Sequence, residues 1–267
     1  MARVLITGCS TGIGRAAAAE LHKRGFDVIA TARRPETLDD LDVAQKLRLD
    51  VDDQASVDEA VAAAGAIDVL VNNAGFGIHT PVEKAPIDEA RRMFETNVWG
   101  AVRMMQAVLP QMRERGSGVI VNVTSLAGLV SEPLGGFYSA SKHALEAISE
   151  ALHYEIGHFG VRVAMIEPGG FETAFGTNRK EFALDEPPYD ELDRRWNEAR
   201  NRLFGGTNEE QPGAEIVAQT IADAVEGKEA KLRWLVGDDA NLVMSVRTQM
   251  NDEDFEATMR ETLKLDW

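Results

Sequence analysis

Seven short apolar runs recur along the chain with longer segments of helical character between them, and this alternation restricts the fold more than any other feature. The runs are rich in Val, Ile and Leu and are continuously apolar, which is typical of strands buried on both faces of a parallel sheet. They occupy residues 4–7, 28–31, 46–50, 67–71, 119–123, 161–166 and 232–236. Segments 13–23, 57–64, 87–108 and 138–156 are predicted as helices that cover the sheet. The alternation predicts a doubly wound α/β fold with a seven-stranded parallel sheet.

The 267 residues are predicted to form one domain over 1–267. The chain is 44% hydrophobic and 27% charged, which suffices for a sizeable core, and no linker rich in Pro, Gly or Ser divides it. Residues 170–212 interrupt the alternation between the sixth and seventh strands. Long excursions in compact α/β domains are usually functional, so a substrate lid is predicted at about 170–212.

Charge and cysteine content exclude several classes of protein. With 28 basic and 44 acidic residues the net charge is −16, the wrong sign for a chain that binds nucleic acid. The single cysteine, Cys9, cannot form an internal disulfide, which favours a reducing, cytoplasmic location. The first apolar run is too short for a signal peptide, and no membrane span is expected. The five histidines lack the spacing of a helical metal site, so no metal is predicted.

A glycine-rich loop follows the first strand directly and leads into the Ala-rich helix. It reads TGCSTGIG over residues 7–14. Glycines allow a tight turn and a close approach of backbone to a pyrophosphate, whose charge then rests on the helix N-terminus. The loop therefore predicts a dinucleotide site at Gly8, Ser10, Thr11, Gly12, Ile13 and Gly14.

The end of the second strand bears on the choice between NADP and NAD. An acidic residue there would hydrogen-bond the ribose hydroxyls, whereas an arginine accommodates a 2′-phosphate. Ala32 stands in place of the acid, and Arg33 and Arg34 follow it, so NADP(H) is favoured and NAD(H) is the alternative. A solvated strand edge would also explain the two arginines. Asp50, at the end of the third strand, could accept from an adenine amino group or cap the next helix.

Tyr138 and Lys142 are four positions apart in a predicted helix and lie on one face of it. A neighbouring ammonium and a nearby nicotinamide cation are expected to lower the pKa of a phenol toward neutrality and so to make it useful in proton transfer. Ser125 ends the fifth strand, and strand C-termini in open α/β sheets face the ligand crevice. The three residues are therefore predicted to meet in a catalytic site.

The ordered motifs are similar to those of the short-chain dehydrogenase/reductase family. They are TGxxxGxG at 7–14, NNAG at 72–75, Asn97, Ser125, YxxxK at 138–142 and Pro168-Gly169. The resemblance implies a Rossmann-type fold, with Tyr138 as general acid or base and Ser125 bound to the substrate oxygen. It implies that Lys142 holds the nicotinamide ribose and tunes Tyr138, and that the backbone carbonyl of Asn97, in a kinked helix, anchors a water of the proton relay.

The same resemblance implies the remaining cofactor contacts and the stereochemistry. Further residues expected at the cofactor are Val51, Asn73, Ala74, Gly75, Pro168, Gly169, Phe171 and Thr173, beside Tyr138, Lys142 and Asp50. Hydride is expected to leave the pro-S face. A homodimer or homotetramer formed through the two long helices is expected.

Within the family, the segments TARRPETL (31–38) and NNAGFG (72–77) look most like members that act on hydroxysteroids, retinoids and other lipophilic ketones. The predicted function is NADP(H)-dependent interconversion of a carbonyl and a secondary alcohol. Two rivals are an NAD-dependent alcohol dehydrogenase and a cofactor-sensing binding protein without catalysis. An apolar lining for the substrate is expected from Phe171, Phe175, Phe182, Tyr189, Trp196 and Phe204, with His79 and Leu134.

Overall fold

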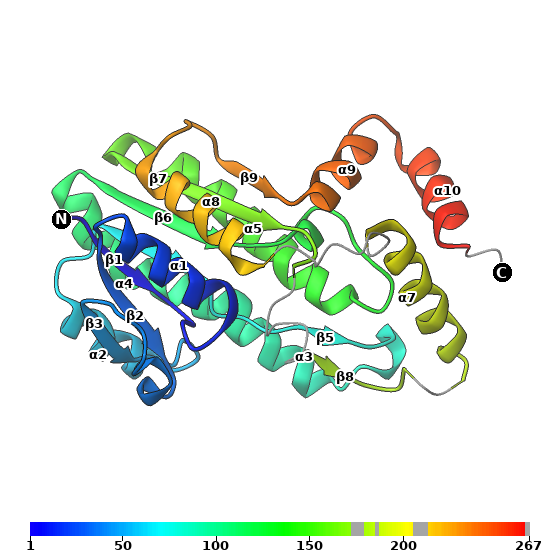
Figure 1. Cartoon of the computed structure of the whole chain (residues 1–267), viewed down its shortest axis with the longest axis horizontal. Helices are drawn as coiled ribbons and strands as arrows, with labels where there is room; N and C mark the ends of the chain where they lie inside the picture. Colours follow the sequence, from blue (N-terminus) through cyan, green and yellow to red (C-terminus); the bar gives the residue numbers. More distant parts are fainter. Residues whose placement is uncertain (172–178, 185–186, 205–212, 265–267) are drawn as a thin grey trace.

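A computed structural model describes residues 1–171, 179–184, 187–204 and 213–264, with the side chains of 203 and 204 left out (Figure 1). The strands are β1 (Arg3–Ile6), β2 (Asp27–Ala32), β3 (Gln45–Arg48), β4 (Val69–Asn72), β5 (Ile78–His79), β6 (Gly118–Val123), β7 (Val161–Pro168), β8 (Lys180–Glu181) and β9 (Arg233–Val236). The helices are α1 (Gly12–Lys23), α2 (Gln54–Ala64), α3 (Ile87–Phe94), α4 (Ala101–Arg115), α5 (Gly136–Ile156), α7 (Asp190–Phe204), α8 (Ala214–Glu226), α9 (Asp238–Arg247) and α10 (Asp252–Leu263).

Seven of these strands form one parallel sheet in the order β3-β2-β1-β4-β6-β7-β9. This confirms the predicted α/β fold with its seven-stranded sheet. The strand order reverses between β1 and β4, which lie side by side although a β2–β3 excursion separates them in the chain. Ligands of open parallel sheets bind at such a switch point, outside the carboxyl ends of the strands.

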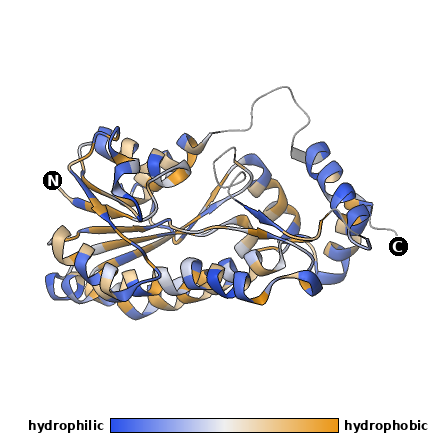
Figure 2. Cartoon of the chain, turned by 90° about the horizontal axis from the view of Figure 1, so that it is seen from below, coloured by the Kyte–Doolittle hydropathy of each residue, from blue (hydrophilic) through white to orange (hydrophobic). Residues whose placement is uncertain are grey.

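The central strands are buried on both faces because helices cover each side, whereas the edge strand β3 is only partly buried. Alternate residues of β1 enter different clusters: Val4 and Ile6 pack toward α1 and α8, and Leu5 packs toward α2, α4 and α5. Figure 2 shows the apolar strands enclosed between helices whose outer faces are hydrophilic. This two-sided burial explains why the runs in the sequence are apolar throughout.

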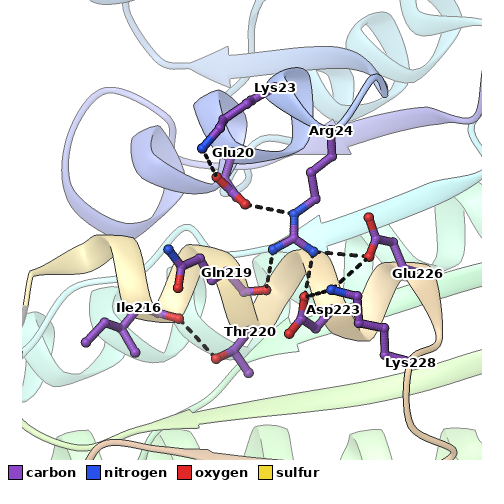
Figure 3. A network of polar contacts seen from close by, with 9 residues as sticks. All are labelled: Glu20, Lys23, Arg24, Ile216, Gln219, Thr220, Asp223, Glu226 and Lys228. Atoms are coloured by element: carbon purple, nitrogen blue, oxygen red, sulfur yellow. Dashed lines mark hydrogen bonds and ion pairs between the residues drawn. The ribbon is translucent and has the colours of Figure 1, made fainter.

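A charged network fastens α1 to α8 on one face of the sheet (Figure 3). Arg24, just beyond α1, donates to Glu20 at 2.7 Å, to Asp223 at 2.5 Å and to Glu226 at 3.1 Å. Lys228 also pairs with Asp223, at 2.7 Å. One guanidinium thus joins two helices that are about 200 residues apart in the chain.

The helix predicted over 87–108 is divided by a π-helical segment, Glu95–Gly100, between α3 and α4. Helix α4 then continues past Pro110 to Arg115, beyond the predicted end. A π-helix bends the path of the chain and is frequent at functional sites. None of the helices in the described part of the chain is both long and apolar enough to cross a membrane.

The segment after β7 adds elements that the sequence pattern did not predict. Strand β8 pairs with β5 in a separate two-stranded sheet. Helix α7 packs on α10 through Trp196 and Ala199, which meet Leu263 and Met259. Met259 and Leu263 of α10 thus pack on α7 of the same chain.

Candidate active site

The glycine loop adopts the conformation that its sequence predicts. Gly8 and Gly12 have φ of +74° and +59°, a region that side chains disfavour. A Cβ on Gly14 would lie 2.5 Å from the Gly8 carbonyl oxygen and closer still to Nδ2 of Asn73. Cys9 in this loop is fully buried, and burial raises the pKa of its thiol to about 12, so it packs as a neutral side chain.

Polar contacts join the glycine loop to the segment after β4. The Thr7 hydroxyl accepts from the backbone N–H groups of Asn73 and Ala74, both at 2.9 Å. The Asn73 amide donates to the carbonyls of Thr7 at 2.9 Å and Gly8 at 3.1 Å. The structure therefore brings together, at the switch point, the two motifs expected to line the cofactor.

The N-terminus of α1 is suited to an anion. Its N-cap residue, Thr11, makes no side-chain capping bond, and its first turn holds no acidic residue. The first N–H groups of a helix need an acceptor, and the helix dipole favours a negative one. The loop and helix thus fit the pyrophosphate of a dinucleotide.

Arg33 and Arg34 are solvent-exposed at the carboxyl end of β2. Within the described residues, neither guanidinium makes a hydrogen bond or an ion pair with the protein. Asp50 does not cap α2, because Asp53 accepts from Ala55 there. Asp50 instead accepts from the N–H of Asp52 at 3.2 Å. A hydrogen bond from the adenine amino group to Asp50 stays a prediction.

Ser125, Tyr138 and Lys142 converge beyond the carboxyl end of β6. Ser125 follows β6 and hydrogen-bonds Tyr138, and its hydroxyl donates to the Pro168 carbonyl at 3.4 Å. The Lys142 Nζ lies 5.8 Å from the centroid of the Tyr138 ring and donates to the Val123 carbonyl at 2.9 Å. The predicted set is therefore assembled from β6 and α5.

Burial controls the protonation of this set. It raises the pKa of Tyr138 well above its usual value; the Ser125 hydrogen bond opposes the rise and the charge of Glu132 adds to it. Desolvation of the phenolate dominates in the protein alone, and the lowering expected from Lys142 together with a bound nicotinamide stays a prediction. Burial lowers the pKa of Lys142 to about 8, against the attraction of Glu146. Tyr138 is a neutral proton donor at neutral pH, and Lys142 is largely an ammonium.

Asn97 lies in the π-helical segment and ties three parts of the site together. Its Oδ1 accepts from the N–H of Phe76 at 3.0 Å. Its Nδ2 donates to the Phe76 carbonyl at 3.0 Å and to the Ser141 hydroxyl at 3.1 Å. The predicted bend at Asn97 is thus present as a π-helix, held against α5 beside Lys142.

The loop after β7 is fixed from β9 and α9. The N–H of Gly169 donates to the Val236 carbonyl at 2.9 Å, and the N–H of Gly170 donates to Asp239 at 2.5 Å. A Cβ on Gly169 would overlap the Asp239 carboxylate. Pro168 and Gly169 thus have a rigid backbone next to Ser125, and Thr173 lies outside the described residues.

A family model described as short chain dehydrogenase matches residues 2–183. The chain belongs to the short chain dehydrogenase family. It is accordingly an oxidoreductase, which confirms the family resemblance of the motifs.

Members of the short chain dehydrogenase family resemble the chain in sequence and in structure. It is 41% identical over 180 residues to the 3-ketodihydrosphingosine reductase of Bacteroides thetaiotaomicron, a match covering 66% of this chain and 66% of that protein. The structure of a short-chain dehydrogenase from Streptomyces avermitilis matches with a TM-score of 0.80 at 37% identity. The match covers 98% of this chain and 99% of that protein. A serine dehydrogenase complexed with NADP+ has a TM-score of 0.73 at 29% identity, with 88% and 94% covered. Solved structures with this fold also include a complex with NADH.

The expected substrate lining is only partly described. Phe171 packs beside Gly237 and the core, and Leu134 is buried. Trp196 packs on α10, and His79 is buried 3.4 Å from Asp193 of α7. Phe182 and Tyr189 are partly exposed, whereas residue 175 and the side chain of residue 204 lie outside the described part.

Three residues that contact or influence the candidate active site were not predicted from the sequence. Ser141 holds Asn97, and Asp239 holds Gly170 across 69 residues. Glu132, six residues before Tyr138, acts on the phenol through its charge. Only the position of Ser141 within YSASK could have been noticed, since the other two contacts depend on the tertiary fold.

Proposed function

We propose that the protein is an NADP(H)-dependent reductase of a carbonyl group, or the corresponding secondary-alcohol dehydrogenase. The observation that carries this proposal is the convergence of Ser125, Tyr138 and Lys142 beyond the carboxyl end of β6, on the same edge of the parallel sheet as the glycine loop that follows β1. The full set argues against a cofactor sensor without catalysis, since a sensor needs no proton donor.

The side chains account for the proton that carbonyl reduction requires. The bound nicotinamide cofactor supplies the hydride in reduction and accepts it in oxidation. Tyr138, held neutral by burial, donates its proton to the carbonyl oxygen, which Ser125 orients by a hydrogen bond. Lys142, which donates to the Val123 carbonyl, would hold the nicotinamide ribose of a bound cofactor, and its ammonium stabilises the phenolate that remains. Asn97, through the bend that it occupies, serves the relay that returns the proton.

The preference for NADP(H) rests on Arg33. Its guanidinium is exposed beside the cofactor loop, and Ala32 supplies no carboxylate to repel a 2′-phosphate. A charge-assisted hydrogen bond from arginine to phosphate is worth about 1.5–3 kcal/mol. That contact distinguishes NADPH from NADH, since NADH lacks the phosphate.

We propose a lipophilic ketone or alcohol as the substrate, bound under a lid at 170–212. The support is the relative named 3-ketodihydrosphingosine reductase, whose name denotes a ketone, and the buried Leu134 close before Tyr138. The hydroxysteroid-like and retinoid-like branch is the narrower form of this proposal.

We further propose a homodimer or homotetramer in the cytoplasm. The long helices α4 and α5 carry or flank exposed aromatic side chains that a second copy could cover: Trp99, Tyr154 and Phe159. The cytoplasmic assignment rests on the single cysteine.

The test is to measure NADPH and NADH binding by calorimetry and then turnover on lipophilic ketones, aldehydes and small keto acids. We expect tighter binding of NADPH and turnover of some lipophilic ketones. Arg33→Ala should weaken NADPH about 10- to 100-fold and leave NADH within twofold, with Lys46→Ala as a control on β3. Equal losses for both cofactors would remove Arg33 from the phosphate site. Tight binding without turnover on any carbonyl would favour the sensor.

A further inference from the structure

Three carboxylates contact the side chain of Arg233, and one of them, Glu146, lies one helical turn from Lys142 on α5. Arg233 of β9 donates to Glu146 of α5, to Glu167 of β7 at 3.3 Å and to Glu150 of α5 at 3.2 Å. Glu146 and Glu167 are 4% and 1% exposed, whereas Glu150 is nearly half exposed. We call these four residues the Arg233 cluster.

The Arg233 cluster is close to the reacting groups. Glu146 follows Lys142 by one helical turn on the same face of α5, and Lys142 itself is 5% exposed. A Cβ on Gly128 would touch both Glu146 and the Lys142 backbone, at 3.0 and 3.2 Å. Strands β6 and β7 pair at Val123 and Ile166, so Val123, whose carbonyl accepts from Lys142, lies opposite the residue that precedes Glu167.

One guanidinium cannot neutralise the carboxylates that meet here. Burial and the charge of Glu146 raise the pKa of Glu167 to about 8, and burial also raises the pKa of Glu146. The groups that face this pair are Lys142 and Glu150 from α5, Arg233 from β9 and the Thr124 hydroxyl that follows β6. Near neutral pH Glu167 is thus largely protonated, and the Arg233 guanidinium is the partner for a negative charge on Glu146.

We propose that Glu146 and Glu167 act as a positioning pair for Lys142, in which Glu146, one helical turn from the lysine and held beside Glu167 by Arg233, keeps the catalytic lysine an ammonium. The inference rests on the proposed function, because the charge acts through Lys142 on Tyr138. A retained ammonium stabilises the phenolate that Tyr138 becomes after it donates its proton. As the pH rises the pair loses its proton, and the second negative charge then supports the ammonium further into the alkaline range.

The proposal is tested by pH profiles of kcat for two variants and a control. Glu167→Gln replaces a neutral carboxyl by a neutral amide, so its profile should match the wild type below about pH 8 and fall earlier above it. The double variant Glu146→Gln/Glu167→Gln removes the charge altogether, and its alkaline limb should move to lower pH by about one unit. Glu150→Gln, on the same arginine but half exposed, should leave the limb in place. A purely structural role would lower kcat equally at every pH and would overturn the proposal.

Thermal unfolding provides a second readout that needs no substrate. A carboxyl whose pKa is raised by folding makes the native state bind the extra proton, so wild-type stability should fall between about pH 5 and pH 8. Glu167→Gln should lack this decline, and parallel wild-type and variant curves would refute a proton held by Glu167 in the pair. If the double variant does not fold, the two profiles of Glu167→Gln decide. An enzyme without turnover on any carbonyl would refute the proposed function, whereas the unfolding curves would still report on the pair.

Discussion

Gly14→Ala should damage both the fold and the cofactor site, because the glycine loop has no room for one methyl group. The new Cβ would lie 2.5 Å from the Gly8 carbonyl oxygen, whereas ordinary contact begins near 3.5 Å, so the loop must move by about 1 Å. Asn73 cannot retreat without weakening its bonds to Thr7 and Gly8. Overpacking costs about 1–3 kcal/mol, and weakening the two hydrogen bonds without breaking them costs about 1 kcal/mol together. We therefore expect a loss of about 2–4 kcal/mol in the free energy of unfolding.

The assay combines thermal unfolding with cofactor titration. For a chain of this size the loss corresponds to a fall in Tm of about 5–10 °C. The displaced N–H groups should also weaken NADPH and NADH alike, by about tenfold or more, because both carry the pyrophosphate. Gly157→Ala is the matched control, since a Cβ there meets nothing within 4 Å. A Gly14→Ala protein with wild-type Tm and wild-type affinity would refute the steric argument.

Two further substitutions test contacts between distant segments. Arg24→Ala removes the guanidinium that joins α1 to α8 and should lower the free energy of unfolding by about 1–2 kcal/mol, with cofactor affinity unchanged. The control, Lys23→Ala at an exposed lysine, should change it by less than about 0.5 kcal/mol. Chemical denaturation measures both variants, and equal effects would show that the network is not stabilising. Asp239→Ala leaves the N–H of Gly170 without its acceptor and should lower kcat/KM about tenfold at nearly constant Tm. The neighbouring Asp238→Ala is the control. An unaltered kcat/KM in Asp239→Ala would show that the loop after β7 does not position the reacting groups.

The sheet could be predicted from sequence because its central strands are continuous apolar runs, although the edge strand β3 has a single apolar residue, Leu47. The conformation of the glycine loop could also be predicted, because Gly8 and Gly12 adopt positive φ, which favours glycine at those positions whatever the tertiary fold. Strands β5 and β8 have two residues each and therefore no periodicity to read. The π-helix at Asn97 is likewise invisible in the hydrophobic pattern, which stays helical across it.

The chemistry of the site could be predicted in its members but not in its electrostatics. Tyr138 and Lys142 follow from their spacing along one helix face. The raised pKa of Tyr138 depends on how deeply the fold buries the ring, which no local pattern records. The contact of Arg233 with Glu146 spans 87 residues and exists only because β9 is placed beside β7.

The measurement that most directly tests the central claim is single-turnover reduction of a ketone by Tyr138→Phe with NADPH bound. The ring is retained, so packing and cofactor affinity should stay near wild type, whereas the proton donor is lost. We expect the rate to fall by a factor of about 100 to 10,000. A variant that binds NADPH normally and reduces the ketone at the wild-type rate would show that Tyr138 does not supply the proton.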